Sequence, residues 1–99
     1  MDKKEVRYGI VGIGKQGTFY TKIFTKLKGL VKGAKLTAVC DILPERRKYA
    51  EENLKGVKVF DNYQDMFKSG LIDVVMVETP HYFHSQIAID AMKAGLNVL

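Results

Sequence analysis

The stretch GIVGIGKQGTFY, from Gly9 to Tyr20, ends an apolar run with glycines at positions 12, 14 and 17. Their spacing is Gly-x-Gly-x-x-Gly, and it falls between a predicted strand over 6–11 and a predicted helix over 16–31. In that setting the first glycine permits a tight turn, the second leaves room for a phosphate against the backbone, and the third lets helix and strand pack closely. The stretch therefore predicts a loop that holds the pyrophosphate of a dinucleotide at the amino end of a helix. The predicted loop consists of Gly12, Ile13, Gly14, Lys15, Gln16 and Gly17.

Short apolar runs and longer amphipathic runs alternate along the rest of the chain, a pattern typical of strand and helix units around a parallel sheet. The run DVVMVE is almost continuously apolar, as expected for a strand covered by helices on both faces. We therefore predict an α/β fold with a doubly wound parallel sheet, a Rossmann fold with strand order 3-2-1-4-5 that ends at its fifth strand. The predicted strands are 6–11, 36–40, 57–60, 73–78 and 97–99, and the predicted helices are 16–31, 44–54, 62–68 and 82–94.

Asp41 follows the second predicted strand and lies 24 positions after Gly17. This interval is close to the roughly 20 residues expected before the acid that binds the adenosine ribose of a dinucleotide. Its carboxylate would accept hydrogen bonds from the ribose hydroxyls and repel a 2′-phosphate, so we expect NAD rather than NADP as the cofactor. Alternatively, Asp41 caps the helix that begins at Pro44. Arg46 and Arg47 on that helix could weaken the exclusion of NADP, but a solvated helix face explains them adequately.

Composition limits the classes of protein to consider. The chain has 99 residues, of which 46% are hydrophobic and 27% charged, as is typical of one soluble domain. The single cysteine, Cys40, excludes an internal disulfide and does not suggest a metal site, so we expect a buried, unreactive thiol. No apolar stretch is long enough to span a membrane and no signal peptide is visible, so we expect a cytoplasmic protein.

The net charge of +5 raises the question of nucleic acid binding, because clustered lysines attract phosphate backbones. The lysines at positions 22, 26, 28, 32 and 35 do concentrate between the first two apolar runs. No aromatic residues alternate with them as stacking platforms for bases. A solvated helix face is the simpler interpretation, and we expect neither nucleic acid nor membrane as a partner.

The stretch ETPHYFH, from Glu78 to His84, stands where the fourth predicted strand ends and the next helix begins. Together with GIVGIGKQG, AVCD and AIDAMKAGLNVL, it resembles the N-terminal domain of the Gfo/Idh/MocA oxidoreductases, the family of glucose–fructose oxidoreductase and inositol dehydrogenase. The resemblance implies that Thr79, Pro80 and His81 lie against the ribose and pyrophosphate of the cofactor. His84 either joins them or is a packed or capping residue. Glu78 departs from the small or apolar residue usual in the family, and its role stays open.

The resemblance also implies what such a domain does in a complete enzyme. The family transfers hydride between a nicotinamide cofactor and a hydroxyl carbon of a sugar, a cyclitol or a related polyol. In the family, AGLNVL is followed by a Glu-Lys-Pro motif and by a second domain with the catalytic histidine, the substrate site and usually the oligomer interface. We therefore expect residues 1–99 to be the dinucleotide-binding domain of a homo-oligomeric protein about three times as long, with no catalytic residue and no turnover of its own.

Two other functions stay open on the sequence. A non-catalytic nucleotide-binding module, such as a redox sensor, could use the same loop without reducing anything. A methyltransferase that uses S-adenosylmethionine can also pair a glycine loop with an acid after the second strand. The fold class alone does not decide among these functions, because one architecture hosts many chemistries.

Overall fold

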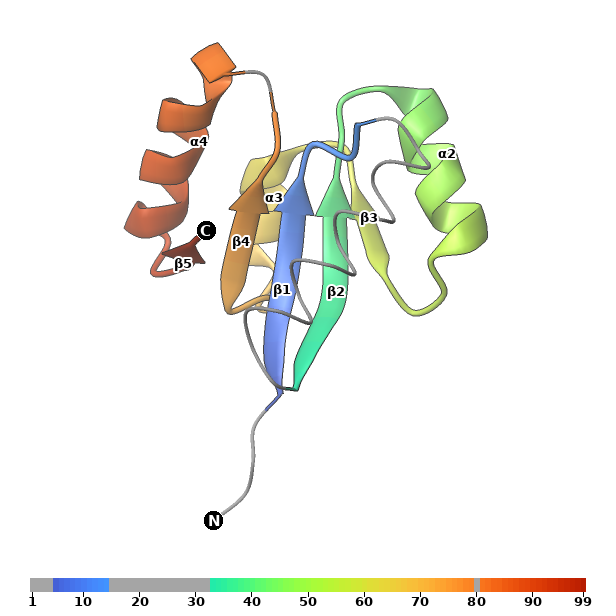
Figure 1. The fold of residues 1–99 in the computed structure, drawn as a ribbon, viewed down its shortest axis with the longest axis horizontal. Helices are drawn as coiled ribbons and strands as arrows, with labels where there is room; N and C mark the ends of the chain where they lie inside the picture. Colours follow the sequence, from blue (N-terminus) through green and yellow to red (C-terminus); the bar gives the residue numbers. More distant parts are fainter. Residues whose placement is uncertain (1–4, 15–32, 80) are drawn as a thin grey trace.

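The computed structural model describes residues 5–14, 33–79 and 81–99, and for residues 81–83 the backbone alone. The described strands form one parallel sheet in the order β3-β2-β1-β4-β5 (Figure 1), which confirms the predicted order. They are β1 (Val6–Val11), β2 (Ala34–Cys40), β3 (Lys58–Phe60), β4 (Val74–Val77) and β5 (Asn97–Val98). β1 has the predicted bounds. β2 begins two residues earlier than predicted, because Ala34 pairs with Val6 of the neighbouring strand.

The described helices are α2 (Pro44–Asn53), α3 (Tyr63–Lys68) and α4 (His81–Lys93). The helix predicted over 16–31 lies outside the described residues. α3 is capped as predicted by Asn62, whose side-chain Oδ1 accepts a hydrogen bond from the N–H of Gln64 at 2.7 Å. α4 begins one residue before its predicted start and is followed by Gly95 with a φ of 85°. Local capping chemistry thus predicted these helix ends to within about one residue.

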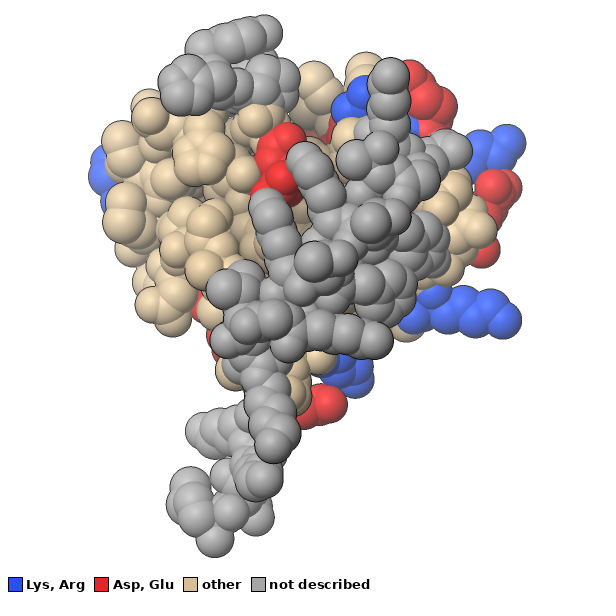
Figure 2. Space-filling view, viewed as in Figure 1, with Lys and Arg blue, Asp and Glu red and all other residues tan. Residues whose placement is uncertain are grey.

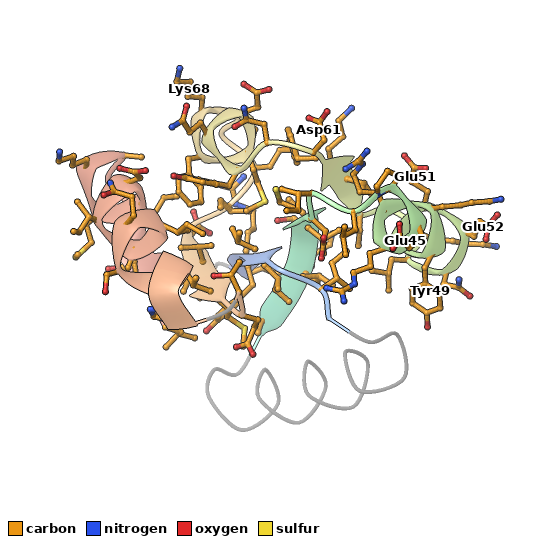
Figure 3. The ribbon with its side chains drawn as sticks, turned by 90° about the horizontal axis from the view of Figure 1, so that it is seen from above. Glu45, Tyr49, Glu51, Glu52, Asp61 and Lys68 are labelled. Atoms are coloured by element: carbon orange, nitrogen blue, oxygen red, sulfur yellow. The ribbon has the colours of Figure 1, made fainter. Side chains whose placement is uncertain are left out.

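Two apolar clusters cover the two faces of the sheet, because successive side chains of a strand point to opposite sides. The cluster beneath α2 takes Tyr8 and Ile10 from β1, Val39 from β2 and Met76 from β4. The cluster beneath α3 and α4 takes the alternate positions, among them Val11, Cys40 and Val77. Charged side chains such as Glu51 and Glu52 of α2 and Lys68 of α3 lie on the outer side of their helices (Figure 3). The central strands are therefore buried on both faces, as the continuous apolar run of β4 predicted.

Gly9, in the middle of β1, leaves room for the second cluster. A Cβ atom at this position would lie 2.8 Å from both Cδ1 and Cγ2 of Ile72 and 3.2 Å from Cε of Met66. Both of these side chains are buried. The glycine that opens the stretch GIVGIGKQG therefore has a packing role, distinct from that of the glycines in the loop.

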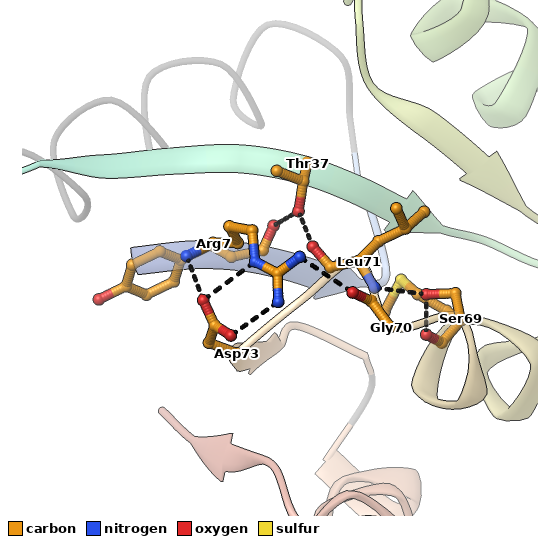
Figure 4. Close-up of polar contacts among 8 residues, drawn as sticks. Arg7, Thr37, Ser69, Gly70, Leu71 and Asp73 are labelled. Carbon is orange, nitrogen blue, oxygen red and sulfur yellow. Dashed lines mark hydrogen bonds and ion pairs between the residues drawn. The ribbon is translucent and has the colours of Figure 1, made fainter. Parts of the chain in front are cut away.

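The amino edge of the sheet is closed by an ion pair between β1 and the turn before β4 (Figure 4). Nη2 of Arg7 lies 2.9 Å from Oδ1 of Asp73, and the Nε and backbone N–H of Arg7 both donate to Oδ2. Nη1 of Arg7 donates to the carbonyl oxygen of Gly70 at 2.9 Å. Beside it, the hydroxyl of Thr37 donates to the carbonyl oxygen of Leu71 at 2.7 Å. The polar side chains of Arg7, Asp73 and Thr37 at this edge all bind other groups of the fold.

Cys40 should react slowly with alkylating agents in the folded protein. Burial, followed by the charge of Asp41, raises the pKa of its thiol to about 12, so the reactive thiolate is scarce below that pH. In the unfolded chain the thiol returns to a pKa of about 8.5. We expect iodoacetamide at pH 8.5 to label the native chain at least about a hundredfold more slowly than the chain in denaturant. Labelling at similar rates in the two states, measured by mass spectrometry, would contradict the burial of Cys40.

Candidate functional site

The turns that follow β1, β2 and β4 meet at the carboxyl edge of the sheet. The backbone N–H of Gly12 donates to the carbonyl oxygen of Cys40 at 2.8 Å, and that of Glu78 donates to Val11 at 2.8 Å. The N–H of Asp41 donates to the carbonyl oxygen of Phe60 at 3.2 Å. The parallel hydrogen-bond ladder therefore continues one residue past the ends of β1, β2 and β4. The glycine turn, Asp41 and the start of ETPHYFH lie along one edge, as the predicted topology requires.

Gly12 lets the turn after β1 approach the turn after β4. Its φ is 91°, a left-handed conformation that favours glycine. A Cβ atom at Gly12 would lie 2.9 Å from the backbone N of Thr79, 3.0 Å from the carbonyl carbon of Glu78 and 3.0 Å from Cγ2 of Thr79. Any side chain here would separate the two turns.

Gly14 also has a left-handed φ, of 74°, but its surroundings differ from those of Gly12. A Cβ atom at Gly14 would have no atom of the described residues within 4 Å. The left-handed φ accounts for a glycine here, and the open space leaves the backbone of Gly14 accessible from outside the described residues. The remaining predicted loop residues, Lys15, Gln16 and Gly17, lie outside the described residues.

Asp41 is 5% exposed and binds two backbone N–H groups with its carboxylate. Oδ2 accepts a hydrogen bond from the N–H of Ile13 at 2.8 Å, and Oδ1 accepts one from the N–H of Leu43 at 2.9 Å. The first bond joins the turn after β1 to the turn after β2. The second fixes the turn before α2. The N-cap of α2 is Leu43, without a side-chain capping bond, so the alternative in which Asp41 caps this helix is wrong.

Arg46 and Arg47 turn back toward Asp41 instead of forming a solvated helix face. Nη1 of Arg46 lies 3.7 Å from Oδ2 of Asp41, and Nη1 of Arg47 donates to the backbone carbonyl oxygen of Asp41 at 2.9 Å. The physical reason is that α2 starts only three residues after Asp41, so its first turn stands directly over the end of β2. The expectation of a solvated face is therefore wrong for these two residues, and both arginines belong to the site.

Thr79 carries an unusual polar atom. Its Oγ1 is buried and has no hydrogen-bond partner in the part of the chain that the structure describes. A buried hydroxyl without a partner costs about 1–3 kcal/mol, so such atoms are uncommon in folded proteins. Pro80 and the side chain of His81 lie outside the described residues, and α4 begins at His81. His84 is half-buried near the start of α4.

Ile42 lies next to the candidate site, and the sequence patterns did not single it out. It follows Asp41 and is 77% exposed, the largest exposed fraction among the large hydrophobic side chains described. Its side chain places apolar surface beside Asp41 at the carboxyl edge, where ligands of open parallel sheets bind. The signal in the sequence was its place between Asp41 and Pro44, where it belongs to neither the strand nor the helix.

Charged side chains of both signs gather over α2, whereas the face over α4 is largely uncharged (Figure 2). Of the lysines at positions 22, 26, 28, 32 and 35, Lys35 is the one that lies within the described residues, and it is exposed. No helix in the described residues is long and apolar enough to cross a membrane. The described part of the surface over α2 therefore carries interspersed charge of both signs.

Known proteins share both the sequence and the fold. The family described as "Oxidoreductase family, NAD-binding Rossmann fold" matches residues 6–99. An inositol 2-dehydrogenase of Corynebacterium glutamicum is 28% identical over 96 residues, which cover 97% of this chain and 28% of that protein. Glycosyl hydrolase family 109 protein 1 of Bacteroides fragilis is 31% identical over 102 residues, which cover 94% of this chain and 21% of that protein.

Among solved structures, scyllo-inositol dehydrogenase from Lactobacillus casei with bound NAD(H) and scyllo-inositol is 33% identical, with a TM-score of 0.77. The match covers 96% of this chain and 27% of that one, so this chain spans less than a third of the length of each of these relatives. The family match extends from the first residue of β1 to the last residue of the chain, through all three turns of the carboxyl edge. The chain therefore belongs to the Gfo/Idh/MocA oxidoreductase family, as its domain with the NAD-binding Rossmann fold.

Proposed function

We propose that this chain binds NAD at the carboxyl edge of its sheet, as part of an oxidoreductase that transfers hydride to or from a hydroxyl carbon of a sugar, a cyclitol or a related polyol. The observation that carries the proposal is the meeting of the Gly14 position, the buried carboxylate of Asp41 and the unpartnered hydroxyl of Thr79 along one edge. The relative crystallised with NAD(H) and scyllo-inositol supports both the cofactor and the substrate class.

The pyrophosphate would lie on the glycine turn. Gly14 leaves the backbone accessible, and Lys15, Gln16 and Gly17 complete the loop. Gly12 contributes indirectly, because it keeps this turn against the turn after β4. Backbone N–H groups bind phosphate oxygens without needing a charged side chain.

The adenosine end of NAD would lie against the side chains of Asp41 and Ile42. A carboxylate has about four acceptor sites, and backbone N–H groups occupy two of those on Asp41. The remaining sites can accept a hydrogen bond from a ribose hydroxyl. The exposed side chain of Ile42 offers an apolar surface on which the adenine ring can pack.

The nicotinamide end would lie toward β4 and α4. Thr79 brings a hydroxyl that gains a partner when a polar ligand arrives, and Pro80, His81 and His84 follow it in the sequence. When bound, NAD supplies hydride transfer, and the residues of this chain hold and orient it. We place the groups that move the substrate proton outside these 99 residues, so the chain by itself would not turn over.

The named relatives differ in the reaction that they catalyse, so they support the cofactor of the whole protein more strongly than its reaction. Relatives that match this domain carry the names of an inositol dehydrogenase and of a glycosyl hydrolase. A non-catalytic nucleotide-binding module and a methyltransferase are the alternatives. We favour the dehydrogenase because the relative solved with both a nicotinamide cofactor and a polyol matches 96% of the chain.

Replacing Gly14 with alanine should weaken NAD binding while the domain still folds. The new methyl group meets no atom of the described residues but would occupy the phosphate position, so we expect Kd to rise at least about tenfold. Gly56→Ala is the matched control, because Gly56 has a φ of 79°, equally open surroundings and a place in the turn before β3. Isothermal titration calorimetry measures both Kd values.

An equal loss of affinity in the Gly14→Ala and Gly56→Ala variants would contradict the phosphate assignment. The same titration with S-adenosylmethionine tests the methyltransferase alternative. Tighter binding of that ligand than of NAD would overturn the proposed cofactor.

Replacing Thr79 with valine should weaken NAD binding without lowering the stability of the ligand-free chain. Because Oγ1 has no partner among the described residues, its removal should leave the Tm of the ligand-free chain unchanged or raise it. The same change should raise the Kd for NAD about fivefold to tenfold, through the loss of a hydrogen bond worth about 1 kcal/mol. Thr79→Ser keeps the hydroxyl and should bind NAD as the original chain does. If the valine variant binds NAD as tightly as the serine variant, Thr79 does not contact the cofactor.

A further inference from the structure

Three polar side chains join α3 to α4 on the face of the sheet opposite α2. The hydroxyl of Tyr63 in α3 donates to Oδ2 of Asp90 in α4 at 2.6 Å. Nε2 of Gln86, one turn earlier in α4, donates to Oδ1 of Asp90 at 2.9 Å. One carboxylate oxygen is therefore bound by the neighbouring helix and the other by the same helix. We call these three side chains the α3–α4 clasp.

Tyr63 gives the clasp a fixed end. Its hydrogen bond is the first cause that lowers the pKa of Asp90 and raises the pKa of Tyr63, so at neutral pH the acceptor is ionised and the donor keeps its proton. A hydrogen bond between such groups is charge-assisted. The Tyr63 ring packs against the second apolar cluster and lies tilted against Phe67, with ring centroids 5.2 Å apart. The hydroxyl thus stands on a ring that the core holds in place.

The clasp adds direction to the packing of α4 on the sheet. Ile87 and Ala91 are buried in the cluster beneath α3 and α4. Apolar burial is not directional, so it holds the helix against the sheet without fixing its position along or about its own axis. A hydrogen bond weakens steeply when its distance or angle changes. The bond from Tyr63 to Asp90 therefore selects one position of α4 among those that the apolar contacts allow.

The position of α4 bears directly on the candidate site. The helix begins at His81, two residues after Thr79, whose hydroxyl is buried with no partner among the described residues. Such a short connection leaves little slack, so a shift or rotation of α4 also moves the turn after β4. Asp90 lies nine positions after His81, about 14 Å along the helix axis. A helix is stiff over this length, so the clasp acts on the turn from its far side.

We propose that Tyr63 is a positioning residue for the NAD site, because it holds α4 and the turn at Thr79 in the geometry that receives the nicotinamide end of the cofactor. This inference rests on the proposed NAD site. Tyr63 acts through Asp90 and does not touch the cofactor. Without the clasp, α4 takes several positions, and the affinity for NAD falls in proportion to the fraction that is competent to bind. The carboxylate of Asp41 is held by the turns after β1 and before α2, so it does not depend on α4.

The test compares Kd values for NAD and ADP, measured by isothermal titration calorimetry in the original chain and in Tyr63→Phe. ADP has the diphosphate and the adenosine but no nicotinamide riboside, so in the proposed site it needs the glycine turn and Asp41 but not Thr79. We expect Tyr63→Phe to raise the Kd for NAD about threefold to tenfold and to leave the Kd for ADP within about twofold. Thr37→Val is the matched control, because it removes one hydroxyl that is bonded within the fold at the amino edge. It should leave both Kd values unchanged.

Variants of Asp90 test the same bond from its acceptor side. Asp90→Asn keeps an oxygen that can accept from Tyr63, whereas Asp90→Ala removes both acceptors. We expect Asp90→Ala to lose NAD affinity as Tyr63→Phe does, and Asp90→Asn to restore most of it. In the ligand-free chain, the amide signal of Thr79 in nuclear magnetic resonance spectra should shift in Tyr63→Phe and stay in place in Thr37→Val. Circular dichroism checks that each variant is folded.

The outcomes separate this role of Tyr63 from the NAD site itself. If the original chain binds NAD and Tyr63→Phe leaves the ratio of the two Kd values unchanged, the role of Tyr63 is overturned and the NAD site stands. The same holds if Tyr63→Phe weakens NAD and ADP alike, because the loss is then a general one. If the original chain does not bind NAD, both proposals are overturned.

Discussion

The close approach of the Gly12 turn to the backbone of Thr79 is the constraint on which the site depends. A Cβ atom at Gly12 would lie within 3.0 Å of three atoms in the turn after β4. The hydrogen bond from Ile13 to Asp41 then ties the turn after β2 to the same loop. One glycine and one buried carboxylate thereby hold together three turns that are distant in the sequence. These contacts bring the exposed backbone at Gly14 and the hydroxyl of Thr79, which has no partner among the described residues, to the same edge.

The two edges of the sheet use their polar groups differently. At the amino edge, Arg7 and Asp73 form an ion pair, and the hydroxyl of Thr37 donates to the carbonyl oxygen of Leu71 (Figure 4). At the carboxyl edge, the hydroxyl of Thr79 is buried with no partner among the described residues. The two threonines thus contrast a hydroxyl that is bonded within the fold with a hydroxyl that has no partner among the described residues. This asymmetry agrees with the general location of ligand sites in open parallel sheets.

Sequence patterns predicted the strand order and the edge at which the site lies, because apolar runs and capping residues act locally. They also predicted Asp41 and Thr79 as site residues, one from its spacing and one from the family resemblance. They did not predict that Asp41 binds the backbone of Ile13, nor that Arg46 turns toward it. Those contacts depend on the direction in which α2 leaves β2, which no local pattern determines. Ile42, by contrast, had a local signal, because it lies between Asp41 and Pro44 and belongs to neither the strand nor the helix.

NAD binding across the glycine turn, Asp41 and Thr79 can be measured by titrating the isotope-labelled chain with NAD and following the amide chemical shifts in nuclear magnetic resonance spectra. We expect the largest shifts at Gly14, Asp41 and Thr79, and unchanged shifts at Gly70 and Asp73 at the amino edge. Shifts centred on the amino edge, or none at saturating NAD, would contradict NAD binding at this site.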